Sequence, residues 1–247
     1  MTASLLSCSV KEERDGCPCW LDIEVTACAR HDDVVYLKGW HDGQSVIGDK
    51  VYLSDFPDIY EKTVPRGMVE YCAYCGINTS LVSGDTIVIS EGNQSDRLYA
   101  YKTTVWADGE HAYDKIIPHK QFATVTVKIN ENKDSSTSIK VNGNTSGFNV
   151  ADMTPVAGRF SFDVERQPEG IYVFRIPRQL DKELFMELSR SGMTFSTIQL
   201  GDLITKTGYD WSATDLEDIY INIDTTDMDM PVIVDVWREG HEYDYKF

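Results

Sequence analysis

The residues whose type and spacing best fit a known chemistry stand near the start of the chain, at Leu5-Leu6-Ser7-Cys8. A leucine three residues before a cysteine, a small serine directly before it and an acidic run after it are typical of a bacterial lipobox. There the thiol is joined to diacylglycerol and the cysteine becomes the first residue of the mature chain. Two or more acyl chains hold a protein at a bilayer, because each buried methylene contributes about 0.8 kcal/mol and one chain binds only marginally. We therefore predict lipid attachment at Cys8; the alternative is an ordinary cysteine beside leucines.

The other five cysteines could form disulfides, stay reduced or bind a metal. If Cys8 is lipidated, an odd number remains, so at least one thiol stays unpaired in an oxidising compartment and one or two disulfides could form. Four thiolates from two short knuckles would make a structural zinc site. The Cys-x-Cys spacing is shorter than zinc knuckles use, so we favour disulfides or free thiols and expect no metal. The zinc candidates are Cys17, Cys19, Cys72 and Cys75, and the remaining thiol is Cys28.

Other chemistry-bearing residues do not form a recognisable catalytic motif. The chain has no nucleophile elbow, phosphate loop, dinucleotide fingerprint or zinc-protease helix, so we predict that it is not an enzyme and needs no cofactor. A glycosidase would need two opposed carboxylates, and a calcium site would need several oxygen ligands. Acidic clusters are also expected in the loops of so acidic a chain. The carboxylate candidates are Asp32-Asp33, Asp215 with Glu217-Asp218, and Asp224, Asp227 and Asp229. The histidines, which we expect at the surface, are His31, His41, His111, His119 and His241.

Aromatic residues allow a binding function as an alternative. Flat rings stack on sugar faces, although β-sandwich cores use the same residues, and core packing is the interpretation we favour. The tryptophans considered for a sugar platform are Trp40, Trp106, Trp211 and Trp237.

Composition limits the partners of the chain. Among 247 residues, 40 are acidic and 23 basic, and the resulting net charge of −17 argues against nucleic acid. The 42% hydrophobic content is too high for a disordered chain. No run approaches the roughly 18 apolar residues of a transmembrane helix, so we expect none.

The elements that must position these residues read mainly as strands. Leu21, Ile23 and Val25 alternate with the acidic Asp22 and Glu24, as in a half-buried strand. Val125, Val127 and Ile129 alternate with the polar Thr124, Thr126 and Lys128 and indicate a second such strand. Further strands are expected at 34–37, 50–53, 86–89, 98–101, 138–141, 160–164, 171–176, 184–188, 194–198, 219–223 and 231–237. Turns are expected at 41–43, 83–85, 91–93, 189–192 and, as a hairpin, at Asn142-Gly143-Asn144.

Two stretches have helical alternatives. Residues 181–190 fit a helix or a strand, and the flanking turns favour the strand. Residues 200–207 favour one short helix that is closed by Gly208.

Short strands separated by polar turns predict an all-β fold built from sandwiches. A break at Ile116-Ile117-Pro118-His119 precedes a new alternating run, so we place a domain boundary near residue 118. The expected organisation is a lipobox and acidic tether at 1–16, an N-terminal β-sandwich at 17–117 and a C-terminal β-sandwich at 118–247.

Segments at both ends of the chain resemble a known family. At the C-terminal end they are 198–204, Gly208-Tyr209-Asp210-Trp211, 216–224 and 232–237. At the start, Lys11-Glu12-Glu13 resembles the acidic signal that sends lipoproteins to the outer face of the outer membrane, and Cys17-Pro18-Cys19 precedes an alternating strand. The C-terminal segments and this Cys-Pro-Cys start are similar to the FimB-type fimbrial anchor lipoproteins of Bacteroides-type bacteria.

This resemblance implies two transthyretin-like antiparallel β-sandwich domains in tandem. It also implies a lipid-anchored, surface-exposed protein of the outer membrane that acts as a fimbria anchor, assembly or cell-adhesion subunit. The implied partners are the outer membrane, through Cys8, and fimbrial or pilin subunits, which would bind by strand addition. The alternative function is a surface glycan-binding lipoprotein.

Overall fold

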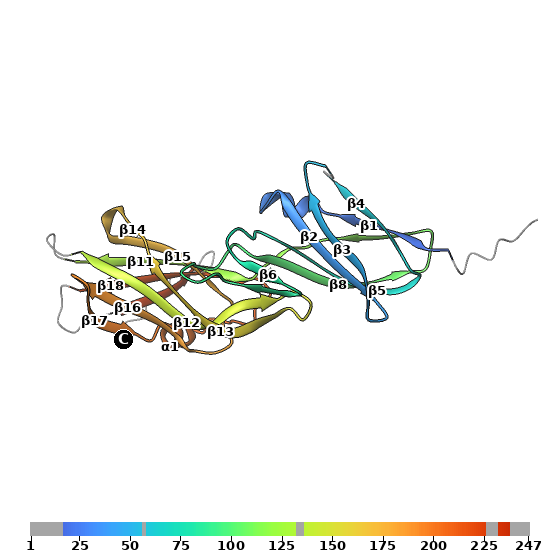
Figure 1. Ribbon diagram of the computed structural model, residues 1–247. Helices are drawn as coiled ribbons and strands as arrows, with labels where there is room; N and C mark the ends of the chain where they lie inside the picture. Colours follow the sequence, from blue (N-terminus) through green and yellow to red (C-terminus); the bar gives the residue numbers. More distant parts are fainter. Residues whose placement is uncertain (1–16, 56–57, 132–135, 226–231, 238–247) are drawn as a thin grey trace, which may run out of the picture.

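The computed structural model describes residues 17–55, 58–131, 136–225 and 232–237 (Figure 1). Strands dominate these residues, which confirms the expected all-β class. In chain order the elements are β1 Cys19–Glu24, η1 Thr26–Arg30, β2 Val34–His41, β3 Gln44–Tyr52, β4 Ile59–Val64, β5 Gly67–Cys75, β6 Leu81–Ser83, β7 Thr86–Val88, β8 Tyr99–Ala107, β9 His111–Lys115, β10 His119–Lys120, β11 Phe122–Asn130, β12 Thr137–Asn149, β13 Thr154–Val164, β14 Arg166–Gln167, η2 Pro168–Gly170, β15 Ile171–Pro177, β16 Leu184–Arg190, β17 Met193–Ile198, α1 Leu200–Lys206, β18 Asp218–Asp224 and β19 Val232–Trp237.

The alternating apolar residues form the cores of two groups of sheets. Leu21 and Ile23 of β1 are fully buried, as are Val125 and Val127 of β11, with Ile129 at 3% exposure. A strand turns successive side chains to opposite faces, so period-two hydrophobicity puts every apolar residue of a half-buried strand on the core side. This is why the sequence pattern located these strands correctly.

The ambiguous stretch at 181–190 contains a strand. Leu184, Met186 and Leu188 of β16 are all fully buried, so the period of two prevails over the helical period. The turn at 189–192 is confirmed, with positive φ at Ser191 and Gly192. The short helix is also confirmed: α1 spans Leu200–Lys206, and Gly208 follows at φ +81°. In the described ranges no helix combines the length and hydropathy needed to cross a bilayer.

The hairpin predicted at Asn142-Gly143-Asn144 is wrong, because these residues continue β12. Gly143 lies under the ring of Phe160, where a Cβ would come within 2.3 Å of a ring carbon. Asn142 Nδ2 donates to Glu187 Oε1 at 2.8 Å, and Asn144 Nδ2 donates to Asp181 at 2.9 Å. The glycine therefore serves close packing within the sheet, and the chain turns only at 150–153.

The strands form four sheets. Their orders are β4-β1-β9, β10-β8-β5-β2-β3, β14-β15-β11-β18-β19 and β17-β16-β12-β7-β6, with β13 on β12. Most pairs are antiparallel, as expected. Two described pairs are parallel, β1 with β9 and β11 with β18. On its other side β1 pairs antiparallel with β4, and β11 pairs antiparallel with β15. The two halves thus repeat one local arrangement, which alternation alone does not reveal.

The hairpin β6–β7 crosses the boundary predicted near residue 118. It leaves the N-terminal half, yet β7 pairs with Gly147–Asn149 of β12 in the C-terminal half. A small hydrophobic cluster fills this junction, including Cys72, Tyr74, Ile87 and Phe148. The larger clusters fill the interiors of the two groups of sheets, which lie end to end in Figure 1. The exact division at residue 118 stays a prediction.

Candidate functional site

The predicted lipid site, Cys8, lies outside the described residues, and its modification stays a prediction. The first described residue is Cys17, which is exposed. It leads through Pro18 into β1.

The zinc candidates Cys72 and Cys75 lie on one strand and face away from each other. Cys72 and Cys75 lie three residues apart in β5, so they point to opposite faces; Cys72 packs in the junction cluster and Cys75 in the N-terminal core. The zinc tetrad is therefore excluded by geometry. Burial raises the pKa of Cys72 to about 12 and also raises the pKa of Cys19, so these thiols stay protonated at neutral pH.

The described histidines take structural roles in four separate places. His31 stacks on Tyr99 with ring centroids 3.6 Å apart, and burial, aided by the charge of Arg30, lowers its pKa. The other contacts are His41 Nδ1 to the Met68 carbonyl at 3.1 Å, His111 Nδ1 to Asp22 at 2.8 Å and His119 Nδ1 to Asp215 at 3.1 Å. His241 lies outside the described residues.

Three carboxylates from the acidic clusters accept hydrogen bonds from backbone amides. Asp32 accepts from the Gly76 amide at 2.9 Å, and Asp215 accepts from the Lys120 amide at 2.6 Å. Asp218 accepts from the Thr124 amide at 2.8 Å. Asp227 and Asp229 lie outside the described residues, so the calcium alternative there stays untested.

Asp96 is a structurally important carboxylate that the sequence did not single out. It is 5% exposed and accepts from the amides of Asn78, Thr79 and Ser80 at 2.8–3.0 Å. Burial alone would raise its pKa, but these backbone hydrogen bonds prevail and lower it. The only available signal was its place in a polar loop.

The tryptophans whose side chains are described do not all meet in one place. Trp40 packs against the junction cluster, whereas Trp211 packs against the C-terminal core beside Tyr209. Trp106 is 62% exposed on β8. Trp237 ends β19, and its side chain is not among those described.

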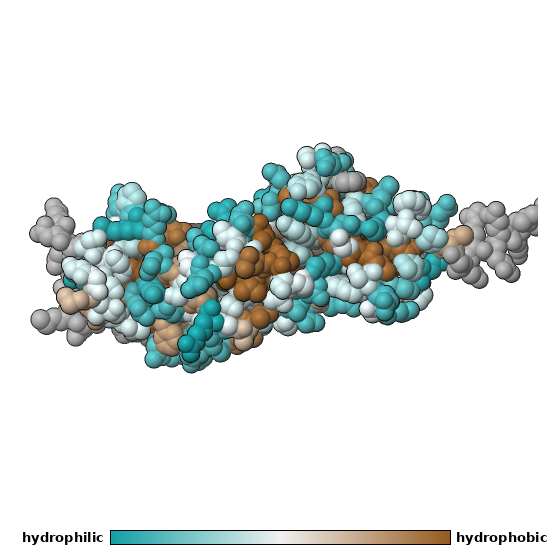
Figure 2. Space-filling model, in the orientation of Figure 1, coloured by the Kyte–Doolittle hydropathy of each residue, from teal (hydrophilic) through white to brown (hydrophobic). Residues whose placement is uncertain are grey.

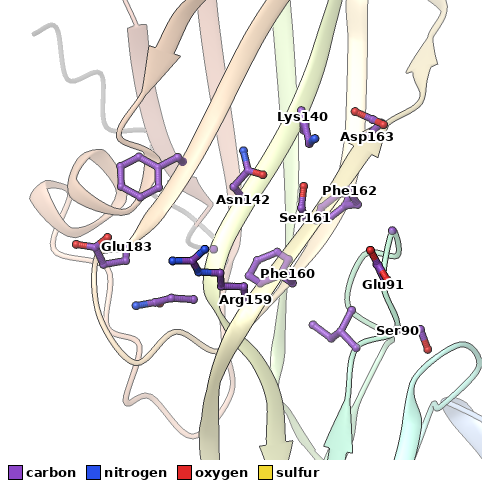
Figure 3. A pocket seen from close by; sticks show the side chains of 15 residues that line it. Ser90, Glu91, Lys140, Asn142, Arg159, Phe160, Ser161, Phe162, Asp163 and Glu183 are labelled. Carbon is purple, nitrogen blue, oxygen red and sulfur yellow. The ribbon is translucent and has the colours of Figure 1, made fainter.

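A hollow of about 1020 Å³ lies on the C-terminal group of sheets (Figure 3). Its floor includes the outer faces of β12, β13 and β16. In the strand register, Lys140 of β12 stands opposite Asp163 of β13, and Asn142 stands between Ser161 of β13 and Phe185 of β16. These side chains share the face of the sheet opposite the buried Val141. In Figure 3 Ser90 and Glu91 stand at one side of the hollow and Glu183 at the other. Strands distant in sequence thus bring cations, carboxylates, an amide and a ring together.

Several charged groups of this hollow are available to a ligand. Lys140, Arg159, Glu91 and Asp163 are exposed, and none forms an ion pair with another described residue. Guanidinium, carboxylate and amide groups can bind vicinal hydroxyls, and the half-buried ring of Phe185 offers a flat apolar surface. The hollow contains no histidine. Sequence analysis missed these residues because it recognised the strands by their buried apolar residues, and the side chains of the hollow lie on the opposite face.

A second surface feature is a sheet edge with apolar side chains, to which none of the other described strands is paired. β13 covers one edge of β12 along its length, so β16 and β7 share the other edge, and β17 and β6 lie beyond them. On β17, Met193 is 72% and Phe195 41% exposed; on β6, Leu81 is 65% and Val82 44% exposed. Figure 2 shows a hydrophobic area over β6, near the middle of the molecule. An unpaired edge with exposed apolar residues favours pairing with another strand.

Comparison with known proteins identifies relatives in structure only. No family model and no curated protein matches the chain by sequence. A candidate adhesin from Bacteroides ovatus is similar in structure at 8% identity, with TM-score 0.66 over 93% of this chain and 95% of that one. A candidate polysaccharide-binding protein from Bacteroides thetaiotaomicron is similar at 14% identity, with TM-score 0.65 over 91% and 100%.

The fimbrial anchor protein Mfa2 from Porphyromonas gingivalis is also similar, at 11% identity and TM-score 0.63 over 90% of this chain and 98% of that chain. None of these three names is that of an enzyme. At such identities the likeness shows a shared fold across nearly the whole chain.

Proposed function

We propose that this chain is a subunit of a surface fimbria or adhesin, held at the outer membrane by lipid on Cys8. The observation that carries the proposal is the fold shared with a fimbrial anchor protein over 90% of this chain. The FimB-type resemblance of both ends supports the anchor role. In this proposal residues 1–16 form the lipidated tether, and residues 17–117 and 118–247 form two sandwich domains.

The lipid is tested by metabolic labelling with a palmitate analogue in cells that produce the full chain. We expect the Cys8→Ala variant to lose the label. Cys17→Ala is the matched control, because Cys17 is an exposed cysteine nearby in the chain, and it should keep the label. Equal labelling of wild type and Cys8→Ala would contradict the anchor.

For the fimbrial partner we propose strand addition at β17. Among the described strands β17 pairs with β16 alone, and its exposed Met193 and Phe195 offer an apolar surface beside the backbone groups of its other edge. A partner strand would gain main-chain hydrogen bonds at that edge and bury these side chains.

The edge is tested by Met193→Lys, which should reduce the amount of filament subunit that co-purifies with the chain, while leaving the fold intact. The matched control is Met68→Lys, because Met68 is 59% exposed but lies on β5, which is paired on both sides. Equal losses for both variants, or no loss for Met193→Lys, would refute the assignment of this edge.

The hollow supports a second candidate function, glycan binding. Its specific observation is a hollow that holds exposed cations and carboxylates, none of them in an ion pair with another described residue, together with the Phe185 ring. Calorimetric titration with glycans from an array should give a signal that Arg159→Ala and Phe185→Ala weaken at least tenfold. Lys128→Ala, an exposed cation on β11, is the control and should bind normally. Unchanged affinity in the hollow variants would exclude this site.

A further inference from the structure

Two buried thiols from distant parts of the sequence meet in the N-terminal core. Cys28 lies in η1, between β1 and β2, and Cys75 is the last residue of β5. Cys28 is 1% exposed and Cys75 0%, and both belong to the same hydrophobic cluster. The two thiols are close enough that Cys28 contributes to raising the pKa of Cys75.

Two contacts besides the thiols hold the segment after Cys28 against the end of β5. The residue after Cys75, Gly76, donates its amide to Asp32 at 2.9 Å. His31 stacks at 3.6 Å on Tyr99, which is the direct partner of Cys75 in the β5–β8 ladder. The segment that carries Cys28 is thus tied to the end of β5 by an amide–carboxylate bond and a ring stack.

The chemistry of the site leaves these thiols few other roles. No group of three or more metal-ligating side chains occurs in the part of the chain that the structure covers, so the pair does not belong to such a cluster. Hydrogen bonding to Cys28, together with burial, raises the pKa of Cys75, so the reduced pair is a poor nucleophile in the folded protein.

We propose that Cys28 and Cys75 form a disulfide that joins η1 to the end of β5. Each thiol loses its proton, one S–S bond forms, and two electrons pass to a protein disulfide of a thiol oxidase, or to oxidised glutathione, which is reduced to two thiols. The exchange runs through a mixed disulfide. Because both sulfurs are buried, it takes place before the N-terminal core closes.

The proposal assigns the other described cysteines as unpaired. Cys72 faces away from Cys75 across β5, in the junction cluster. Cys19 is buried in β1, and Cys17 is exposed at the start of the described chain. A disulfide persists only in an oxidising compartment, which agrees with export. The pairing is nevertheless tested on the isolated protein, so its failure would leave the fimbrial proposal untouched.

The test is to refold the full chain in a glutathione redox buffer, alkylate the free thiols in denaturant and map the peptides by mass spectrometry. We expect one cross-linked peptide pair that contains Cys28 and Cys75 and separates on reduction. Cys28→Ser and Cys75→Ser should each lose it, and Cys72→Ser is the matched control that keeps it. Complete alkylation of both residues in the wild type, or a different predominant pair, would overturn the proposal; this readout needs no variant to fold.

Thermal unfolding gives a second readout. A disulfide that closes a loop of about 50 residues should raise Tm by roughly 8–16 °C over the reduced protein. The same difference is expected in Cys72→Ser and none in the Cys28→Ala, Cys75→Ala double variant. Equal Tm values for the oxidised and reduced wild type would contradict a disulfide in this core.

Discussion

Asp96 holds the turn that leads into the β6–β7 hairpin, and removing its charge should destabilise the fold. The carboxylate is 5% exposed and accepts from three consecutive backbone amides, those of Asn78, Thr79 and Ser80, and from the Thr79 hydroxyl at 3.1 Å. Asp96→Asn keeps the size of the side chain while it removes the charge and replaces one acceptor oxygen with a donor NH₂ group. The perturbation is therefore almost purely electrostatic.

The expected size follows from the contacts that change. A hydrogen bond to a charged group contributes about 1.5–3 kcal/mol, against about 0.5–1.5 kcal/mol for a neutral pair, and a buried amide left without an acceptor costs about 1–3 kcal/mol. With at least one amide unsatisfied in Asp96→Asn, we expect the free energy of unfolding to fall by about 2–4 kcal/mol. For a chain of this size that corresponds to a loss of about 5–15 °C in Tm.

The effect should depend on pH in a defined direction. The pKa of Asp96 is lowered in the folded state from its usual 3.8, because the backbone hydrogen bonds outweigh burial. Its ionised form therefore stabilises the fold fully above the unfolded pKa, and this contribution is lost as the pH falls through the folded pKa. The difference between wild type and Asp96→Asn should be constant near neutral pH and shrink below about pH 4.

The assay is urea unfolding followed by circular dichroism at pH 7 and at pH 3.5. Asp152→Asn is the control, because Asp152 is exposed and its side chain makes no hydrogen bond to another described residue. The control should change stability by less than about 0.5 kcal/mol. If Asp96→Asn behaves like the control at pH 7, or if its deficit grows in acid, the reasoning is wrong.

Two further predictions concern packing and thiol reactivity. Gly143→Ala would place a Cβ 2.3 Å from the Phe160 ring and should cost about 1–3 kcal/mol in a urea titration, whereas Gly48→Ala, with open space around it, should be close to neutral; equal effects would contradict the packing argument. Cys72, buried and with its pKa raised to about 12, should resist iodoacetamide at pH 8 in the native protein while exposed Cys17 reacts; rapid alkylation of Cys72 in the folded chain would contradict its burial.

The sequence predicted those strands that bury one face. β1, β11 and β16 have apolar residues in alternation because one side packs on a core and the other meets a more polar environment. β5 was missed as a strand because its second half, from Tyr71 to Cys75, is buried on both faces. Its Cys-Ala-Tyr-Cys run then suggested a metal knuckle, although strand geometry sends the two sulfurs apart.

The errors and omissions arise where distant contacts override local signals. Asn142-Gly143 has the composition of a tight turn. The ring of Phe160, seventeen positions on, packs so closely on residue 143 that only a glycine fits there. The hollow could not be assembled from the sequence, since its floor depends on the register of three strands and its wall on loop 89–92. No local pattern specifies such a register.

The passage of the β6–β7 hairpin into the C-terminal sheet gives the two halves a second connection besides the chain near residue 118. If only the chain near residue 118 connected the two halves, tension would act on that single covalent path. Because β7 is bonded side by side to β12 at Gly147–Asn149, a pull that separates the halves must shear several hydrogen bonds together and expose the junction cluster to water. Separating the two halves therefore costs the β7–β12 pairing and the packing of the junction cluster in addition to extending the covalent link.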